Sequence, residues 1–320
     1  MIEIRMGRDE DIPKILEFIK KAGFTERSLA SWNGEKMEAV IALDKGSIVG
    51  AIPFAVRQLV IAKGKFARVG YLSAVFVKDG YRSKGIGSTL LSFIKEVVPE
   101  LDCLAVNRKC KEGEDRAYKW YIRNGFFDLV TVKVLFAEVS EIGTDERNGF
   151  ETSVRKVDNS NIDRLDYEKM LKLFEFAFGE NGGFEKRDKT FWKGRFRYHY
   201  YKMLNEYFLL TLSRGDEVVA YTIFAKNFIH EKNGKVDVLE YGFDRSKANV
   251  NDLVSALTLF CSDRGIPVMR FVTSDETEAY SQILSLGFEE RDNFKFMVLP
   301  LKESVLVGKA PWAFFSFDYI

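Results

Sequence analysis

The stretch SAVFVKDGYRSKGIGSTLL, residues 73–91, decides the predicted fold of this chain. Its apolar run at residues 74–77 predicts a buried strand, and Lys78-Asp79-Gly80 predicts a turn after it. From residue 86 onward, apolar residues recur at helical spacing as far as Val97, and Pro99 follows the expected helix end. The stretch therefore predicts a strand, a glycine-rich loop and a helix in direct succession.

The loop between strand and helix reads Arg82-Ser83-Lys84-Gly85-Ile86-Gly87. Gly85 and Gly87 remove side chains where the chain turns into the helix. Backbone N–H groups are then left open at the positive end of the helix dipole. Arg82 and Lys84 add positive charge beside those donors. The loop therefore predicts an anion site, for which a diphosphate is the natural ligand.

Three other kinds of loop contain glycines at this spacing or close to it. A Walker loop ends in Gly-Lys-Ser or Gly-Lys-Thr, an ending that residues 82–88 do not have. A Rossmann turn needs a third glycine, but Leu90 occupies that position. The plain interpretation is an ordinary glycine-rich turn between a strand and a helix.

The pattern Arg-x-x-Gly-x-Gly after a buried strand resembles motif A of the GNAT (Gcn5-related) N-acetyltransferases, in which this loop holds the pyrophosphate of acetyl-CoA. Residues 117–126, AYKWYIRNGF, resemble motif B of the same family, with Tyr121 four residues before the Gly-Phe pair. The predicted order of strands and helices across residues 1–140 also resembles that family. The resemblance implies an N-acetyltransferase domain that uses acetyl-CoA.

Length and composition set broad limits on the protein. A chain of 320 residues with 46% hydrophobic residues is long enough for two domains with substantial cores. The net charge of +1 provides no overall field to attract nucleic acid, and no apolar run is long enough to span a membrane. Cys103, Cys110 and Cys261 lack metal-ligand spacing. We therefore expect a cytoplasmic protein without a metal, a nucleic-acid partner or a membrane partner.

The second half of the chain repeats the element order of the first after a polar linker at residues 143–149. Its loop at residues 245–250 is the counterpart of residues 82–87 but has lost both glycines, and Ile283 stands in the place of Tyr121. The repeat predicts an α/β (α+β) protein with two GNAT-like domains, each a mixed, mostly antiparallel sheet flanked by helices. The predicted division is a catalytic domain at 1–144, a degenerate domain at 145–302 and a tail at 303–320. Tandem members of the family, including the Eis-like group, are similar.

The resemblance also implies roles for individual residues. The backbone of Phe76 and Val77 would bind the pantetheine arm where neighbouring strands splay apart. The diphosphate would be bound by the backbone of residues 82–87 and by the hydroxyl of Ser88, and Asn107 matches a position that often contacts the cofactor. Tyr121 matches the residue that in many relatives gives a proton to the leaving thiolate. Its alternative role is that of a packed core tyrosine.

The general base is left open by the sequence. Many relatives carry a Glu on the strand before the loop, whereas residues 71–76 contain no carboxylate. One possibility is a water bound by Ser73 that relays the proton. Another is the terminal carboxylate of Ile320, at the end of the aromatic tail 311–320, because Eis-like enzymes and N-myristoyltransferases bring such a carboxylate into the site. The alternative for the tail is a final strand or brace packed on the sheet.

The function predicted from these residues is direct transfer of an acetyl group from acetyl-CoA to an amine in a ternary complex, because no Cys lies beside the loop as a nucleophile. One alternative is a catalytically inactive acyl-CoA sensor or interaction protein. The other is a related transferase that uses aminoacyl-tRNA. The acceptor stays open between a small amine, an aminoglycoside-like compound, a peptide N-terminus and a lysine side chain. The basic aromatic run at residues 195–201, which includes His199, is interpreted as a packed amphipathic helix.

Overall fold

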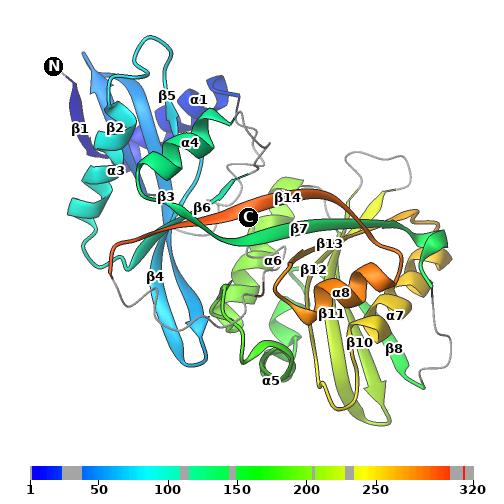
Figure 1. The fold of residues 1–320 in the computed structure, drawn as a ribbon. Helices are drawn as coiled ribbons and strands as arrows, with labels where there is room; N and C mark the ends of the chain where they lie inside the picture. The colour runs from blue at the N-terminus through cyan, green and yellow to red at the C-terminus, as the bar shows by residue number, and fades with distance from the viewer. Residues whose placement is uncertain are drawn as a thin grey trace.

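The computed structural model describes residues 2–23, 38–108, 115–143, 149–203, 206–227, 234–302 and 313, and for residues 197–203 and 227 the backbone alone. The described chain forms two lobes joined by two long strands (Figure 1). The described α-helices are α1 Ile12–Lys21, α3 Ile86–Val97, α4 Arg116–Arg123, α5 Tyr167–Phe178, α6 Lys189–Met203, α7 Val250–Asp263 and α8 Glu278–Ser285. None of these described helices is long and apolar enough to cross a membrane.

The described strands form one sheet that runs through both lobes. In the first lobe they are β1 Glu3–Met6, β2 Glu38–Asp44, β3 Ser47–Ala62, β4 Lys65–Leu72, β5 Phe76–Val77, β6 Cys103–Arg108 and β7 Phe127–Glu138. The later strands are β8 Glu151–Val157, β9 Phe184–Glu185, β10 Glu206–Arg214, β11 Glu217–Asn227, β12 Lys235–Phe243, β13 Val268–Ser274 and β14 Glu289–Pro300. The order in the sheet is β1-β2-β3-β4-β6-β14-β7-β13-β12-β11-β10-β8, with β5 and β9 paired to β3 beside this path.

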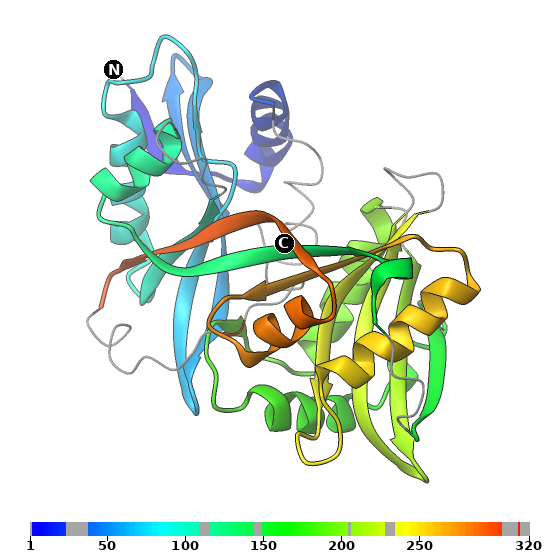
Figure 2. The same cartoon turned by 45° about the vertical axis from the view of Figure 1, so that its right-hand side comes forward.

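The two lobes share their last strands. Strand β14, from the end of the described chain, pairs antiparallel with β6 of the first lobe, for example Met297 with Val106. Strand β7, which follows α4, pairs antiparallel with β13 of the second lobe, for example Phe271 with Leu135. The two strands also pair with each other along most of their length and run together between the lobes (Figure 2). Each lobe therefore depends on a strand from the other half of the sequence to complete its sheet.

Helices cover both faces of the sheet in the first lobe. Alternating residues of β2 point to opposite faces, as expected for a strand. Val40 and Ala42 pack with the buried side of α3, including Leu90 and Ile94. Ala39, Ile41 and Leu43 pack on the other face with Ile15 and Ile19 of α1. The sheet is thus the middle layer, and β2 is apolar on both of its faces because a helix covers each one.

The second lobe repeats this layered arrangement. Helices α7 and α8 pack on one face, where Leu253, Leu257 and Ile283 contact inward residues of β10 to β12. Helices α5 and α6 supply Met170, Trp192 and Phe196 to a core on the opposite face. The predicted two-lobed fold of mixed, mostly antiparallel sheets with flanking helices is confirmed.

Two details of the strands differ from the sequence prediction or extend beyond it. We expected Pro53 to interrupt the second strand of the first hairpin, but β3 continues through it, with Ala51 and Phe54 paired to Ile41 and Glu38 of β2. The predicted domain boundary at residues 144 and 145 stays a prediction. In the sheet, β7 from before this boundary lies between β14 and β13 from after it.

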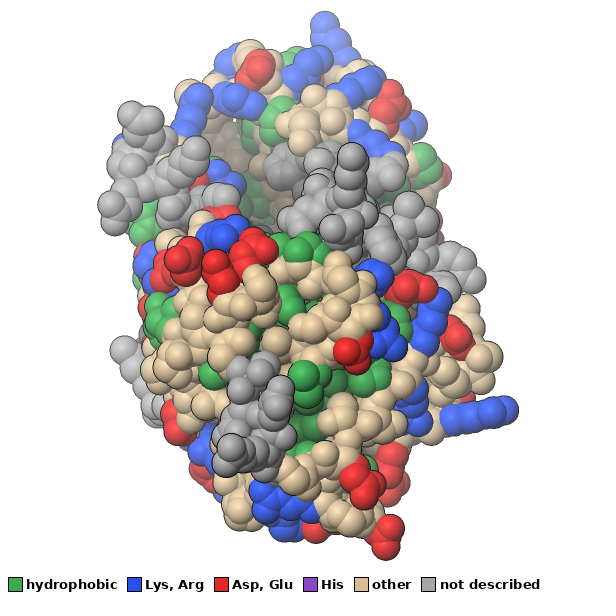
Figure 3. Space-filling view, turned by 90° about the vertical axis from the view of Figure 1, so that its right-hand side faces the viewer, with side chains coloured by type: hydrophobic (Ala, Val, Ile, Leu, Met, Phe, Trp, Pro, Cys, Tyr) green, Lys and Arg blue, Asp and Glu red, His purple; other side chains and the backbone are tan. Residues whose placement is uncertain are grey.

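The stretch that contains His199 is helical, within α6, as predicted, whereas the side chain of His199 and all of His230 lie outside the described part. On the outward face of the second lobe, Lys and Arg side chains alternate with Asp and Glu side chains over the part that is described (Figure 3). This face therefore carries charges of both signs.

Candidate functional site

The glycine-rich loop leads into α3 with its backbone donors open. Gly85 is the N-cap of α3 and has φ +78° and ψ −6°, a left-handed conformation that favours glycine. In the described part of the chain no side chain caps this helix start. The first N–H bonded within this turn is that of Thr89, which donates to Gly85 O at 3.0 Å. The N–H groups of Ile86, Gly87 and Ser88 therefore have no partner in the helix and can bind an anion.

The charged residues of the loop are held in different ways. Arg82 donates through Nε to the carbonyl of Val77 at 2.9 Å and forms an ion pair with Asp79 at 2.8 Å. Its guanidinium also lies 5.1 Å from the ring centroid of Phe76. The positive charge of Arg82 is therefore shared with Asp79, and the Val77 carbonyl already has a donor.

Lys84 and Ser83 lie at the exposed outer side of the loop. Lys84 Nζ is 5.4 Å from the ring centroid of Tyr81, whose hydroxyl donates to Asp44 at 2.6 Å. That hydrogen bond raises the pKa of Tyr81. Ser83 has φ +62°, so the backbone is left-handed at two positions of the loop, Ser83 and Gly85. The loop thus turns sharply enough to bring its exposed side chains beside the open helix start.

Helix α4 contributes two side chains to this site that the sequence analysis missed. Arg116 Nη2 donates to Ser83 Oγ at 3.2 Å. A Cβ added to Gly87 would lie 3.3 Å from Cζ2 and 3.5 Å from Nε1 of Trp120, so the indole packs against the glycine backbone. Arg116 and Trp120 are four residues apart and lie on one face of α4. This i, i+4 spacing within the predicted motif B helix was the available signal.

The start of α4 is fixed by its own cap. Asp115 accepts hydrogen bonds from the backbone N–H groups of Ala117 at 2.9 Å and Tyr118 at 3.2 Å. It also forms an ion pair with Arg108 of β6 at 2.6 Å. Although desolvation opposes the shift, the hydrogen bond from Arg108 lowers the pKa of Asp115. The cap therefore stays ionised and holds α4 beside the loop.

Two neighbouring strands diverge next to the loop and form a fork. Strand β4 pairs parallel with β6 at Val69–Cys103, Gly70–Leu104 and Tyr71–Ala105, and no further. The chain then bends, and Phe76 and Val77 of β5 pair with Ala51 and Gly50 of β3 instead. The residues predicted to bind a pantetheine arm thus lie on one side of a fork whose vertex is the Tyr71–Ala105 pair.

Asn107 lies two residues beyond that vertex and one residue before the end of β6. Its Nδ2 donates to the hydroxyl of Tyr71 at 2.5 Å. Its Oδ1 is buried and has no hydrogen-bond partner among the described residues. The structure therefore places Asn107 inside the fork with an open acceptor.

Tyr121 lies in the core beneath α3. Its side chain is 5% exposed, and its ring packs edge-on against Trp120 and Phe126 at centroid distances of 5.0 and 5.1 Å. Burial raises the pKa of its hydroxyl well above the ordinary value. Within the described part of the chain no hydrogen bond is made by this hydroxyl. These contacts leave the predicted role as proton donor untested.

Of the two residues proposed to serve the general base, Ser73 is described by the structure and Ile320 is not. Ser73 follows β4 directly, and its N–H donates to the carbonyl of Pro53 at 2.9 Å. Ile320 lies outside the described residues. The one described residue of the tail is Ala313, which is buried and donates its N–H to the carbonyl of Gly182 at 2.8 Å. Gly182 itself abuts Ile61 of β3, so this part of the tail reaches the junction of the two lobes.

The equivalent helix start in the second lobe is closed by its own side chains. Asn249 caps α7 by accepting from the N–H groups of Asn251 and Asp252, and the carboxylate of Asp252 accepts from the N–H of Asn249. Arg245, the counterpart of Arg82, donates to the carbonyl of Ala177. The vertex between β12 and β13 holds an ion pair of Asp237 and Arg270 at 3.1 Å. An anion therefore has no open set of backbone donors at this helix.

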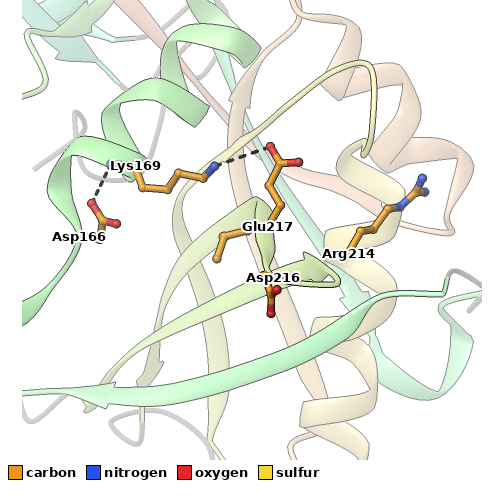
Figure 4. Close-up of a pocket in the computed structure, with 6 residues that line it drawn as sticks. Asp166, Lys169, Arg214, Asp216 and Glu217 are labelled. Atoms are coloured by element: carbon orange, nitrogen blue, oxygen red, sulfur yellow. Dashed lines mark hydrogen bonds and ion pairs between the residues drawn. The ribbon is translucent and has the colours of Figure 1, made fainter.

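A separate hollow of about 500 Å³ lies at the surface of the second lobe. Figure 4 shows its charged side chains, among which Lys169 and Glu217 point toward one another at 3.9 Å. Its lining residues are Asp166, Lys169, Arg214, Asp216, Glu217 and Val218. Charges of both signs offset one another here, and no cluster of potential metal ligands is found among the described residues.

Comparisons with known proteins agree on the fold. Residues 10–126 match the acetyltransferase (GNAT) family. A GCN5-related N-acetyltransferase from Anabaena variabilis is 12% identical, with 93% of this chain and 72% of that chain covered and a TM-score of 0.67. A tandem GNAT protein from the clavulanic acid biosynthesis pathway is 11% identical over 94% of this chain and 98% of that chain, with a TM-score of 0.58.

A third solved structure, N-myristoyltransferase of Saccharomyces cerevisiae with bound myristoyl-CoA, is 13% identical, with coverages of 93% and 79% and a TM-score of 0.57. None of the curated proteins compared with the sequence matches it. At these identities the solved structures show a shared fold, whereas the family match covers the loop, the fork and α4. Residues 10–126 therefore match the GNAT acetyltransferase family, and the chain has the fold of a tandem GNAT protein.

Proposed function

We propose that this protein is a CoA-dependent N-acyltransferase, that its donor is acetyl-CoA and that its acceptor is an amine. The observation that carries this proposal is the uncapped start of α3, whose open N–H groups lie beside the fork between β5 and β6. An open helix start favours a diphosphate, and a fork between strands leaves backbone groups free to hold an extended arm. The match of residues 10–126 to the GNAT family supports the same donor class.

In this proposal the donor binds along the first lobe. The N–H groups of Ile86, Gly87 and Ser88 hold the diphosphate, with Arg82, Ser83 and Lys84 around it. Phe76, Val77 and Asn107 line the fork that takes the pantetheine arm. The acyl end would then lie near the vertex, where an amine can attack the thioester carbonyl directly.

Direct transfer requires an amine without its extra proton and a proton for the leaving thiolate. Tyr121 stays the proposed donor to the thiolate. Ser73, through a water, and the carboxylate of Ile320 stay the two routes for the amine proton that the sequence suggests. Removal of the last three residues separates these routes, because full activity of the shortened protein excludes the terminal carboxylate.

The decisive experiment pairs a binding measurement with a transfer assay. Calorimetric titration with CoA measures occupation of the loop, and thiol release from acetyl-CoA with a panel of amines measures transfer. The panel contains a diamine, an aminoglycoside, a peptide with a free N-terminus and N-α-acetyl-lysine amide. CoA binding with amine-dependent thiol release supports the proposal, and failure to bind CoA refutes it.

The same experiment distinguishes the alternatives. An acyl-CoA sensor would bind CoA and release no thiol with any amine or with longer acyl donors. A transferase that uses aminoacyl-tRNA would not need the open helix start, so the uncapped α3 favours the CoA thioester. A cytoplasmic location, without a nucleic-acid or membrane partner, is part of this proposal.

A further inference from the structure

The vertex of the fork carries a tyrosine that the sequence analysis did not assign to the chemistry. Tyr71 is the last residue of β4 in register with β6, opposite Ala105. Its ring lies 5.8 Å from that of Phe296 on β14, and its hydroxyl meets Nδ2 of Asn107. A thioester with its diphosphate at α3 and its arm along the fork would bring the acyl group to this vertex. Tyr71 therefore lies where the reaction of the proposed transferase takes place.

The contacts of Tyr71 favour the ionised form of a phenol. Asn107 donates to its oxygen at 2.5 Å, and a donor to the oxygen stabilises phenolate more than phenol. The guanidinium of Arg57, on β3, lies 4.9 Å from its ring centroid and adds a positive charge. Arg57 is only 5% exposed, so solvent screens this charge weakly.

The second lobe holds Arg57 in place. Glu185 of β9 forms an ion pair with Arg57 at 2.9 Å, and Arg195 of α6 binds the same carboxylate. Burial opposes ionisation of Glu185, but Arg195 and Arg57 together lower its pKa, so the carboxylate stays charged. Of the charged groups on this side, Arg57 lies over the Tyr71 ring, and Glu185 and Arg195 form the ion pairs behind Arg57. The groups from β6 and β14 that face it, Asn107 and Phe296, are uncharged.

We infer that Tyr71, oriented by Asn107 and placed beside Arg57, is the general base of the acyl transfer. This inference rests on the proposed function. The Tyr71 phenolate takes one proton from the acceptor ammonium, and the resulting free amine forms the C–N bond at the thioester carbonyl. The C–S bond then breaks, and the second nitrogen proton ends on the thiolate of CoA, either directly or through Tyr121. Tyr71 loses its acquired proton to solvent before the next cycle.

The kinetic test uses kcat as a function of pH at saturating acetyl-CoA, with the best acceptor of the panel. Tyr71→Phe should lower kcat about 100-fold and remove the rise of kcat with pH, while CoA affinity stays within a few-fold. Asn107→Ala removes the donor to the phenolic oxygen, so the rise should move to higher pH. Tyr280→Phe is the matched control, since that hydroxyl also bonds a side chain, Glu290 at 3.2 Å, but lies in the second lobe. An unchanged profile for Tyr71→Phe overturns the inference and leaves the transferase standing.

A second readout does not require turnover. In protein labelled with ¹³C at the tyrosine ζ carbon, the signal that disappears in Tyr71→Phe belongs to Tyr71 among the 13 tyrosines. Its titration midpoint should lie below the value of an ordinary tyrosine, about 10. A midpoint at or above the ordinary value overturns the assignment as a base. A lowered midpoint in a protein that transfers no acyl group to any amine refutes the proposed function, and the assignment of Tyr71 as a base with it.

Discussion

The indole ring of Trp120 occupies the space that a side chain on Gly87 would need. Its Cζ2 lies 3.3 Å from the position of a Cβ at that glycine. Gly87 belongs to the loop that resembles motif A, and Trp120 belongs to the helix that resembles motif B. The two motifs are therefore in direct contact, and the conformation at the start of α3 depends on where α4 packs.

This contact predicts the effect of Gly87→Ala. The added methyl group must displace Trp120 by a few tenths of an ångström, and overpacking of this kind costs about 1–2 kcal/mol. If that cost falls on the loop that binds the donor, CoA affinity drops about 10-fold. Titration calorimetry measures the loss. A double-mutant cycle with Trp120→Leu should show strong coupling, and additive effects of the two changes would contradict the proposed link.

Gly85→Asp should abolish CoA binding without unfolding the protein. A Cβ at Gly85 meets nothing within 4 Å, so there is room for a side chain, and Asp tolerates a left-handed backbone better than most residues. Its carboxylate would repel a diphosphate at the open helix start. Gly85→Asn is the matched control, because it has the same shape and backbone tolerance without the charge. Equal CoA affinity for the Asp and Asn variants would remove the diphosphate from this loop.

Tyr121→Phe should lower kcat about 10-fold or more while CoA affinity stays nearly the same. Burial raises the pKa of Tyr121 above its ordinary value, so the hydroxyl keeps its proton as the pH rises. The loss should therefore be similar at every pH from 6 to 9, unlike that of Tyr71→Phe. Tyr118→Phe on the same helix is the control, since its hydroxyl bonds Asp128 at 3.0 Å. Normal turnover of Tyr121→Phe would make this residue a core tyrosine only.

Neither half of the chain should fold alone. A fragment of residues 1–144 lacks β14, so β6 loses its antiparallel partner, and buried residues such as Phe296 and Val298 are missing from the core of the first lobe. We expect this fragment to aggregate or to show no cooperative unfolding by circular dichroism. Co-expression with residues 145–320 should restore a soluble complex. A stable monomeric fragment with the unfolding temperature of the full chain would contradict the shared-strand architecture.

Asp11 should contribute acid-sensitive stability. Its carboxylate accepts from Arg5 at 2.6 Å and from the N–H of Arg8 at 2.9 Å, and these bonds lower its pKa to about 2. A lowered pKa stabilises the fold above the unfolded value of about 4, and that stability is lost as the pH falls from about 5 to 2. Asp11→Asn should thus cost about 2 kcal/mol at pH 7 and nothing near pH 2. Urea unfolding across this range measures it, and Glu17→Gln, in an exposed pair with Lys21, should show no measurable change.

Local patterns in the sequence predicted most of the elements correctly. Helical spacing marked α3, and Gly125 of the Gly-Phe pair, at φ +90°, follows the end of α4. The loss of both glycines in residues 245–250 also matched a helix start that is closed by its own caps. These features depend on residues close together in the chain, so a short window of sequence carries the necessary information.

Contacts between distant residues could not be read in the same way. Tyr71 and Asn107 are 36 residues apart, and Arg57 and Glu185 are 128 apart. The pairing of β14 with β6 of the first lobe could not be predicted either. The sequence of β14 is that of an ordinary strand and does not indicate its partner. Pro53 was misread because the sequence does not show that both neighbours of a proline can keep their strand partners.

By itself, the sequence determined the two lobes, the strand–loop–helix unit and the open donors at Gly85–Gly87, because backbone conformation and hydrophobic periodicity are local properties. Only the tertiary structure decided that β7 pairs in the second lobe and β14 in the first. It also decided that Trp120 packs against Gly87, and that Asn107 and Arg57 contact Tyr71 at the vertex of the fork. The physical reason is that a sheet edge or a buried charge takes its partner from whichever segment packing brings to it, and that choice is made by the whole chain.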